Sequence, residues 1–575
     1  MKFTHTPLLS QLLPAWRARF VLLMLMLAFA ALVGRSLYLQ GVDNNFLQQK
    51  GESRYGRVIE LSATRGRIAD RNGDPLAVSA PVKSIWAIPE YAQLTPAQTR
   101  DLAAVLEMDV RDLSRRLAMD KDFVFLKRQI PPEAAEKVTS MKLPGVYQQA
   151  EYRRFYPSGE VTAHLLGFTG VDDSGQEGME LAFNKPLTGA PGSRRVIKDR
   201  RGQIVEDVQS VKAPRDGSDI TLSVDSKIQY LAYASLKQCI TENNAKAGGI
   251  VVLDVKTGEV LALVNAPTYN PNNREKLTGA QLRNRALTDT FEPGSTMKPF
   301  TIALGLESGK FRPNTLIATG NGQMTIGKAT IHDSHPDGTL TVAQVIQKSS
   351  NIGASKIALS LAPESMWNNF EALGFGNAPK LGFPGESPGH VRPWQYWKPI
   401  EQATMSFGHG ISVSLLQLAH AYEVFARDGD MLPLSLVRVD GPAPAGKQVL
   451  SPETARQVRA MLEMVVQPGG TATKAAIPGY RVGGKTGTAH KLEGAHYSNR
   501  YIASFVGLAP ASDPRLIVAV MIDEPSAGKY YGGDVAAPVF AKVMAGALRT
   551  LGVASDAPLV PMQYAGKVED VKESM

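Results

Sequence analysis

Cysteine is almost absent from this sequence: Cys239 is the only one among 575 residues. A single thiol cannot form an internal disulfide, and no cysteine lies near the N-terminal apolar run where a lipid could be attached. Apolar residues precede Cys239 at helical spacing, which predicts a thiol buried in the core without a function of its own. The fold must therefore be stable without covalent crosslinks.

Concentrated charge is also missing. Lysine and arginine exceed aspartate and glutamate by nine, but the excess is spread along the chain without basic runs or interleaved aromatic residues. This pattern argues against a nucleic-acid partner and suits a surface near anionic lipids or an anionic polymer. With 43% hydrophobic residues the chain is not disordered, and its length predicts more than one domain.

Long apolar runs are rare, and the one that matters spans residues 20–39. At about 1.5 Å per residue it reaches roughly 30 Å, the thickness of a hydrocarbon core. Basic residues precede it, so the positive-inside rule predicts a cytoplasmic tail at 1–19 and an exported remainder. A cleavable signal peptide is the alternative, because residues 28–30 fit a small-x-small cleavage site. The apolar residues that follow this site favour a retained single-pass anchor.

The exported chain is predicted to divide near a turn at 213–217 that contains proline and glycine. Residues 40–215 are mixed and rather polar, carry no concentrated catalytic cluster, and include predicted helices at 95–117 and 131–141.

Residues 216–554 predict an α+β domain with an antiparallel sheet sandwiched by helices, after which a polar, flexible tail is expected at 555–575. Asp225 or Ser226 is predicted to cap the helix that carries Cys239. The sheet is expected to combine the first β-rich segment of the domain, at 249–264, with the last ones, at 501–508 and 516–522. A closing helix is expected at 538–548.

A serine hydroxyl and a lysine amine stand three positions apart at the start of a predicted helix, as Ser295-x-x-Lys298. Residues i and i+3 share a helix face, so the amine can be the base that activates the hydroxyl to form an acyl-enzyme. Alone the pattern is weak, because about two matches are expected by chance in a chain of this length.

Two further motifs follow in the chain. Ser349-x-Asn351 is predicted on a loop between two helices, where a hydroxyl can relay a proton and an amide can hold a substrate backbone. Residues 485–488 combine a fixed positive charge and two hydroxyls with a glycine that permits close approach of a ligand, which suits a substrate carboxylate.

Several patterns compete with these motifs. Residues 526–529 repeat the serine-lysine spacing in a loop, and residues 256–258 repeat lysine-threonine-glycine at the tip of the predicted hairpin. Residues 479–486 match the phosphate-loop pattern, but no buried strand precedes them and no clear helix follows. His332 and His335 lie in a predicted solvated loop without a third ligand, so no metal site is expected.

The three motifs in this order resemble those of the penicillin-binding transpeptidases. The resemblance covers nearly the whole chain and is closest to class B, monofunctional penicillin-binding proteins of the division (FtsI) type, because elongation-type relatives in Gram-negative bacteria tend to carry an acidic residue at Asn351. Its other motifs are Arg65-Gly66, Asp70-Arg71-Asn72-Gly73, Leu76-Ala77, Arg154-Phe155-Tyr156-Pro157, Glu177-Gly178 with Glu180, Tyr531-Gly532-Gly533 and Ala537-Pro538-Val539-Phe540.

The resemblance implies a pedestal or dimerisation-like domain at 40–215 and a penicillin-binding domain at 216–554, held by the inner membrane with the catalytic domain in the periplasm. It implies acyl transfer from the D-Ala-D-Ala end of a peptidoglycan stem peptide to an amine acceptor, without cofactor or metal, and inhibition by β-lactams. No glycosyltransferase signature appears before the penicillin-binding domain. The implied partners are therefore a membrane glycosyltransferase of the FtsW type and other divisome proteins.

The family's catalytic roles transfer to five matching residues, one of them Lys485 as a nearby cation that would lower the pKa of Lys298. Ser295 is the implied nucleophile and Lys298 its base, while Ser349 relays a proton to the leaving amine and Asn351 holds the substrate amide.

Substrate binding is implied for the last motif. Lys485, Thr486 and Thr488 would face the substrate carboxylate, with Gly487 allowing its approach, and the backbone N–H groups of Ser295 and Thr488 would form the oxyanion hole.

Two alternatives remain within the same chemistry. One is an elongation-type or specialised paralogous penicillin-binding protein. A serine β-lactamase must hydrolyse its acyl-enzyme, and the Glu-x-x-Leu-Asn segment used for that step in class A enzymes is absent between Asn351 and Lys485.

Overall fold

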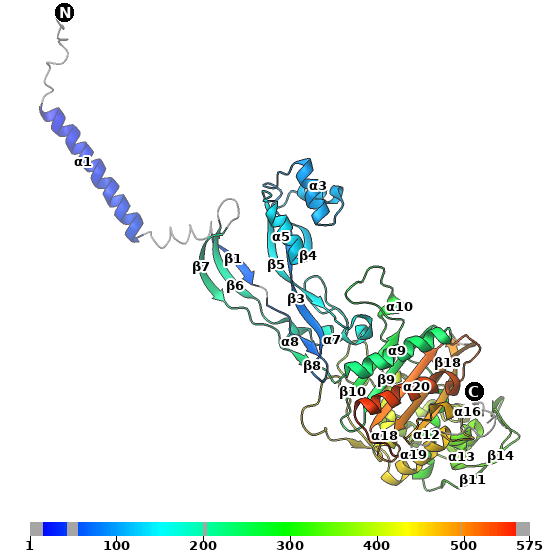
Figure 1. Ribbon diagram of the computed structural model, residues 1–575. Helices are drawn as coiled ribbons and strands as arrows, with labels where there is room; N and C mark the ends of the chain where they lie inside the picture. The colour runs from blue at the N-terminus through cyan, green and yellow to red at the C-terminus, as the bar shows by residue number, and fades with distance from the viewer. Residues whose placement is uncertain (1–14, 43–55, 62, 199–203, 495, 559–575) are drawn as a thin grey trace, which may run out of the picture. The chain divides into compact units, whose positions relative to one another are not determined.

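The computed structural model describes residues 15–42, 56–61, 63–198, 204–494 and 496–558 (Figure 1). Most of the predicted cytoplasmic tail and of the predicted C-terminal tail lies outside these residues. The chain divides into two compact units, and each consists of separate stretches of sequence. The first unit comprises Met1–Ala63, Lys83–Glu151 and Ala190–Asp216, and the second comprises Thr64–Val82, Tyr152–Gly189 and Gly217–Met575.

Helix α1 (Ala15–Leu37) covers nearly all of the predicted membrane anchor. It has 23 residues and none of them is buried. At about 1.5 Å per residue the helix reaches roughly 35 Å, enough to cross a hydrocarbon core. Within the described residues it is the one helix long and apolar enough to span a membrane. Retention of this segment as an anchor stays a prediction.

The first unit contains a three-stranded antiparallel sheet and a small helical cluster. The sheet has the order β1 (Gly56–Leu61), β6 (Gly192–Lys198) and β7 (Ile204–Lys212). The helices are α3 (Pro96–Val105), α4 (Val110–Leu117) and α5 (Pro132–Ser140), which pack with β4 (Val124–Ile130) around a core that includes Leu102, Leu113 and Leu126.

The prediction of one helix over residues 95–117 is wrong, because two helices occupy that stretch. Glu107 has a φ of +48°, which ends the first helix, and Asp109 begins the second by accepting a hydrogen bond from the Arg111 N–H at 2.8 Å. Side-chain oxygens at this position satisfy helix N–H groups that would otherwise lack partners. The aspartate is thus an N-cap and not a residue on a continuous helix face.

A buried ion network joins distant parts of the second unit. Glu180, on α7 (Gly178–Ala182), accepts hydrogen bonds from Arg65 Nε at 2.7 Å and from Arg154 Nε at 2.6 Å. The three side chains are at most 1% exposed. Their charges are compensated by one another and by further bonds from Arg65 to the Glu180 carbonyl, Asn184 and Thr188.

The main sheet of the second unit has five antiparallel strands and confirms the predicted combination of first and last segments. Its order is β10 (Val260–Ala266), β9 (Ala247–Asp254), β19 (Leu516–Asp523), β18 (His496–Ala509) and β17 (Gly483–Glu493). Strand β17 is therefore an edge strand.

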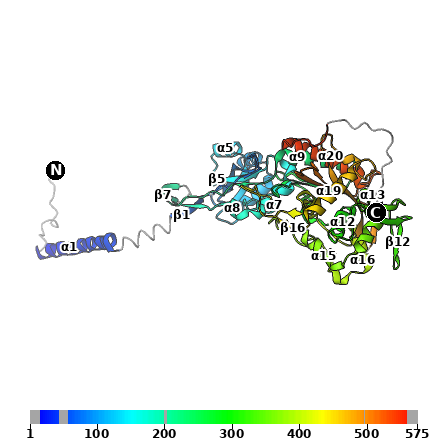
Figure 2. The same cartoon turned by 90° about the horizontal axis from the view of Figure 1, so that it is seen from below.

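Helices cover both faces of this sheet. Adjacent residues of a strand point to opposite faces, and a Cβ at Gly248 would meet Leu236 of α9 (Ser226–Glu242) whereas one at Gly249 would meet Leu415 of α17 (Leu415–Ala421). Helix α20 (Gly532–Thr550) packs on the α9 side, where the two helices lie side by side (Figure 1 and Figure 2). The predicted helix–sheet–helix layering is confirmed.

The ends of helices α9 and α20 test the local predictions for this unit. Asp225 caps α9 by accepting from the Lys227 and Ile228 N–H groups, and Cys239 is buried with a pKa raised by burial to about 11, as expected of a core thiol. The closing helix, however, begins at Gly532 and not at Pro538, which lies inside it. A proline inside a helix is unusual, so the sequence around Pro538 does not indicate the turns of helix that precede it.

We expect the buried network to be essential for stability of the second unit. Glu180→Ala leaves two buried guanidinium groups without their carboxylate, which should cost about 3–5 kcal/mol of unfolding free energy. The matched control is Asp440→Ala, which breaks an exposed pair with Arg438 and should cost less than about 1 kcal/mol. Thermal unfolding of the full-length protein in detergent measures both, and equal effects would contradict a structural role for Glu180.

Candidate active site

The Ser295 turn is fixed by its neighbours. A 3-10 turn (Gly294–Met297) leads into α12 (Lys298–Glu307), and Gly294 has a φ of +59° that a side chain would strain. Tyr422 donates a hydrogen bond to the Thr296 carbonyl at 2.9 Å. The turn therefore presents Ser295 from a rigid position.

Helix α12 is anchored by an aromatic cluster. The Phe300 ring lies 5.1 Å from the Phe425 ring, 5.3 Å from Tyr422 and 5.6 Å from Phe375, measured between centroids. All four side chains are fully buried. Contacts of this kind contribute about 0.5–1.5 kcal/mol each beyond area burial, so α12 has little freedom to shift.

Lys298 brings the first two motifs together. Its Nζ lies 2.9 Å from Ser295 Oγ and 3.0 Å from Ser349 Oγ, and it also donates to the Ser349 backbone carbonyl. Lys298 and Ser349 are completely buried and Ser295 is 2% exposed. Burial disfavours the charged form of an amine, so this environment favours Lys298 as a proton acceptor for Ser295.

The Ser349 loop joins two helices, as predicted. Helix α13 (Val342–Lys348) ends at Ser349, whose φ of +62° is left-handed, and Ser350 begins α14 (Asn351–Leu359) by accepting from the Gly353 N–H at 2.9 Å. The left-handed residue reverses the chain sharply, which is how both the hydroxyl and the carbonyl of Ser349 reach one amine.

Asp333 braces this loop, and sequence reasoning missed it. Its carboxylate accepts from the Asn351 N–H at 2.6 Å, from the Ile352 N–H at 3.0 Å and from Ser350 Oγ at 2.5 Å. A carboxylate at the start of a helix satisfies free N–H groups and interacts favourably with the helix dipole. Asn351 itself donates through Nδ2 to the His332 carbonyl at 3.0 Å.

The segment around Asp333 was notable in the sequence for its histidines. His332 and His335 are both exposed, and no group of three or more potential metal ligands occurs among the described residues. The absence of a metal site stays a prediction. The residue of functional interest in this segment is Asp333, at the end of a β-strand. The sequence alone does not show that it contacts the start of a helix 18 residues later.

Strand β17 carries the third motif against the Ser295 turn. A Cβ at Gly487 would lie 2.7 Å from the Pro293 carbonyl oxygen and 3.0 Å from Thr296 Cγ2, so only glycine allows this approach. Lys485 is completely buried, and its Nζ donates to Thr486 Oγ1 at 3.1 Å.

Residues of two other segments hold the side chains of Thr486 and Thr488. Thr486 Oγ1 lies 2.9 Å from Thr471 Oγ1, and Thr488 Oγ1 accepts from the Gly532 N–H at 3.0 Å. Because Lys485 and Gly532 donate to these oxygens, each hydroxyl proton can be donated onward to an anion. The first two motifs therefore meet at the Lys298 amine, and the third lies against the turn that carries Ser295. Their action as one catalytic centre stays a prediction.

The competing patterns lie elsewhere. Ser526 donates to the Asn244 carbonyl at 2.8 Å on an exposed loop, and residues 256–258 turn the β9–β10 hairpin with Gly258 at a φ of +73°. Residues 479–486 run from a turn into strand β17 rather than into a helix, which confirms that they are not a phosphate loop.

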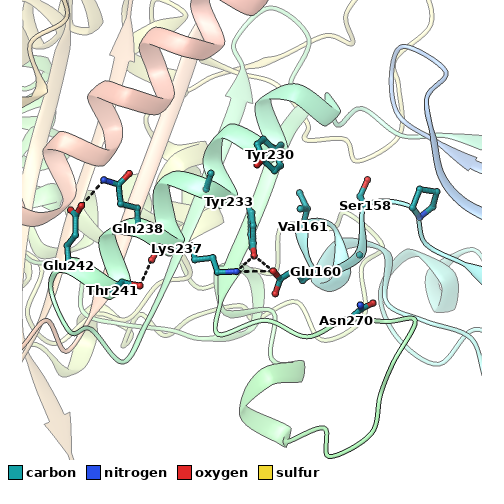
Figure 3. Close-up of a pocket in the computed structure, with 13 residues that line it drawn as sticks. Ser158, Glu160, Val161, Tyr230, Tyr233, Lys237, Gln238, Thr241, Glu242 and Asn270 are labelled. Carbon is teal, nitrogen blue, oxygen red and sulfur yellow. Dashed lines mark hydrogen bonds and ion pairs between the residues drawn. The ribbon is translucent and has the colours of Figure 1, made fainter.

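A shallow cavity of about 1030 Å³ lies apart from this centre, along α9 (Figure 3). On its wall Lys237 Nζ lies 2.9 Å from Glu160 Oε1 and 2.8 Å from Tyr233 Oη, and Tyr233 donates to the same carboxylate. This triad is closed on itself and balances its own charge. We assign the cavity no chemistry.

Comparison with known proteins agrees with these observations. The penicillin binding protein transpeptidase domain matches residues 248–545, and the penicillin-binding protein dimerisation domain matches residues 60–222. Probable peptidoglycan D,D-transpeptidase PenA of Neisseria gonorrhoeae is 45% identical, with 94% of each chain covered. Peptidoglycan D,D-transpeptidase FtsI of Escherichia coli K12 is 43% identical, with 94% of this chain and 93% of the relative covered.

A solved structure shows the same likeness. The apo TP domain of Burkholderia pseudomallei penicillin-binding protein 3 is 52% identical with a TM-score of 0.55, and covers 59% of this chain and 98% of its own.

We expect Asp333→Ala to slow acylation at the site by about 10- to 100-fold, because the loop that holds Ser349 and Asn351 loses three hydrogen bonds and a small misplacement of catalytic groups is costly. The rate of covalent labelling by a fluorescent penicillin measures this. Asp337→Ala on the same loop is the control and should label at the wild-type rate. Wild-type labelling of Asp333→Ala would contradict the bracing role.

Proposed function

This chain belongs to the penicillin-binding transpeptidases, and on that premise we propose that it crosslinks peptidoglycan stem peptides through an acyl-enzyme on Ser295 during septal wall synthesis. It is a serine acyltransferase of the peptidoglycan D,D-transpeptidase type. The observation that supports the assignment of the nucleophile is the Ser295–Lys298–Ser349 cluster, with contacts of 2.9 and 3.0 Å around one buried amine.

The first half-reaction forms the acyl-enzyme. Lys298 takes the proton of Ser295, whose oxygen bonds to the carbonyl carbon of the penultimate D-alanine. The backbone N–H groups of Ser295 and Thr488 stabilise the negative charge that develops on the carbonyl oxygen. Ser349 then passes a proton to the leaving nitrogen, and the terminal D-alanine departs.

Donor recognition involves the other motif residues. Lys485 supplies a fixed positive charge beside the hydroxyls of Thr486 and Thr488, which can donate to the terminal carboxylate of the donor. Asn351 holds the substrate amide. A β-lactam mimics this donor, acylates Ser295 and blocks the site.

The N-terminal part of the chain supports anchoring. Helix α1 fits a single-pass membrane anchor. We propose a cytoplasmic N-terminus and a periplasmic catalytic domain, with residues 40–215 as pedestal. Because a transpeptidase does not make glycan, its partners would be a membrane glycosyltransferase of the FtsW type and other divisome proteins.

Removal of the nucleophile gives the most direct check. Ser295→Ala should abolish labelling by a fluorescent penicillin with the thermal transition unchanged, and Lys298→Ala should lower the labelling rate by at least about 10³-fold. Lys485→Ala should mainly lower the rate of acylation by the penicillin. Ser526→Ala is the matched control and should label normally. Persistent labelling of Ser295→Ala with loss in Ser526→Ala would move the nucleophile.

The cellular role needs a separate experiment. Depletion of the protein should produce filamentous cells, because septal crosslinking stops while elongation continues. Round cells would instead indicate an elongation-type enzyme, and normal shape would indicate a specialised paralogue. Rapid turnover of bound penicillin by the purified protein would indicate a β-lactamase.

A further inference from the structure

Glu292 stands three residues before Ser295 and joins three separate segments of the second unit. Its Oε1 accepts hydrogen bonds from the Gly410 N–H at 2.8 Å and from the Tyr497 hydroxyl at 3.1 Å. The segment that contains Gly410 also packs on the nucleophile turn, where the Gly294 N–H donates to the Gly408 carbonyl at 3.4 Å. Glu292 is thus held beside the turn that carries Ser295.

The second carboxylate oxygen of Glu292 is unusual. Oε2 is buried, and within the described part of the chain it meets no hydrogen-bond donor. A buried polar atom in this state costs about 1–3 kcal/mol. Burial raises the pKa of Glu292, an effect opposed by the bonds from Gly410 and Tyr497. A donor group brought by a substrate would remove the unfavourable state of Oε2.

Tyr497, which contacts Glu292, and His409, which packs on Tyr497, do not neutralise the charge of the carboxylate. The His409 ring lies 5.9 Å from the Tyr497 ring between centroids. Burial is the main cause that lowers the pKa of His409 to about 4, so its ring is neutral at neutral pH. Tyr497 keeps its proton, because burial and the nearby Glu292 raise its pKa to about 12.

The reaction requires a group that no residue assigned so far supplies. If the proposed function is correct, an amine of a second stem peptide must attack the acyl-enzyme, and a free amine is an ammonium at neutral pH. Among the assigned residues Lys298 and Lys485 are lysines, and the others carry no charged side chain. A carboxylate beside Ser295 is the complementary partner for an incoming cation.

We propose that Glu292, together with Tyr497 and His409, forms the subsite that binds the acceptor amine. The ammonium donates to the buried Oε2, and one of its protons passes to the Glu292 carboxylate. The neutral nitrogen bonds to the acyl carbonyl carbon while the bond from that carbon to Ser295 Oγ breaks. The second proton of the amine goes to Ser295 Oγ, which leaves an amide crosslink, a free serine and a protonated Glu292 that loses its proton to water.

The test separates acyl transfer from acylation. Full-length protein in detergent is given an acyl-D-alanyl thioester as donor and Nα-acetyl-lysine as acceptor, whose one amine is the ε-amine. The ratio of amide to hydrolysis product is measured against amine concentration. Glu292→Gln should lower this ratio by about tenfold or more, and should change the penicillin acylation rate much less. Glu292→Asp keeps the charge and should retain more of the ratio.

Two further variants complete the design. Glu307→Gln is the matched control. Glu307 lies at the far end of α12, where its carboxylate accepts a hydrogen bond from the Ser451 N–H at 2.9 Å. This variant should leave the product ratio and the penicillin acylation rate unchanged. Tyr497→Phe removes one donor to the Glu292 carboxylate and should lower the ratio about threefold, because the carboxylate loses its fixed orientation. This variant decides the question if Glu292→Gln fails to fold.

The outcomes distinguish the two proposals. Wild-type ratios in Glu292→Gln, or in Tyr497→Phe where it is the deciding variant, would overturn the acceptor subsite. An equal fall of acylation and transfer would also overturn it, because that result marks a structural role. If wild-type protein is not acylated by penicillin at all, the proposed function fails instead.

Discussion

The enclosure of one lysine amine is the constraint on which the catalytic unit depends. Lys298 Nζ must be buried deeply enough to favour its neutral form and still lie within hydrogen-bond distance of two hydroxyls. Two segments make this possible: the rigid turn before α12 and the left-handed reversal at Ser349. The edge strand β17 packs against the same turn, because Gly487 has no side chain. A displacement of the turn or of the Ser349 loop would break the hydrogen bonds of this amine.

Charge is distributed across this centre in a way that matches a two-substrate reaction. Lys485 lies with the hydroxyls that suit an anionic donor end, whereas Glu292 lies beside the nucleophile turn with neutral ring side chains around it. These opposite charges would favour binding of the anionic donor end and of the cationic acceptor amine at different residues. Asp333 has a structural role, because its carboxylate accepts hydrogen bonds from the N–H groups at the start of α14.

Sequence reasoning succeeded where the determining contacts are local or follow a motif. The Ser295–Lys298 pair, the Asp225 cap and the β9–β10 hairpin depend on residues a few positions apart. It failed at Glu107, where one residue with positive φ separates two helices that the sequence pattern predicts as one. It also failed at the start of α20, because Pro538 lies inside this helix and not at its first position. Asp333 could not be identified, because its partners are supplied by a later loop that only the folded chain brings close.

The order of strands in the main sheet also sets a sequence of events during synthesis. Ala247 of β9 pairs with Asp523 of β19, and Arg65 binds Glu180, 115 residues later. Contacts between such distant positions form slowly and only after both partners exist. The central strands therefore stay incomplete until nearly the whole polypeptide has been made. We therefore expect nascent chains to be unreactive towards a cell-wall peptide or an antibiotic, because β17 has no complete sheet to hold it against the Ser295 turn until that late stage.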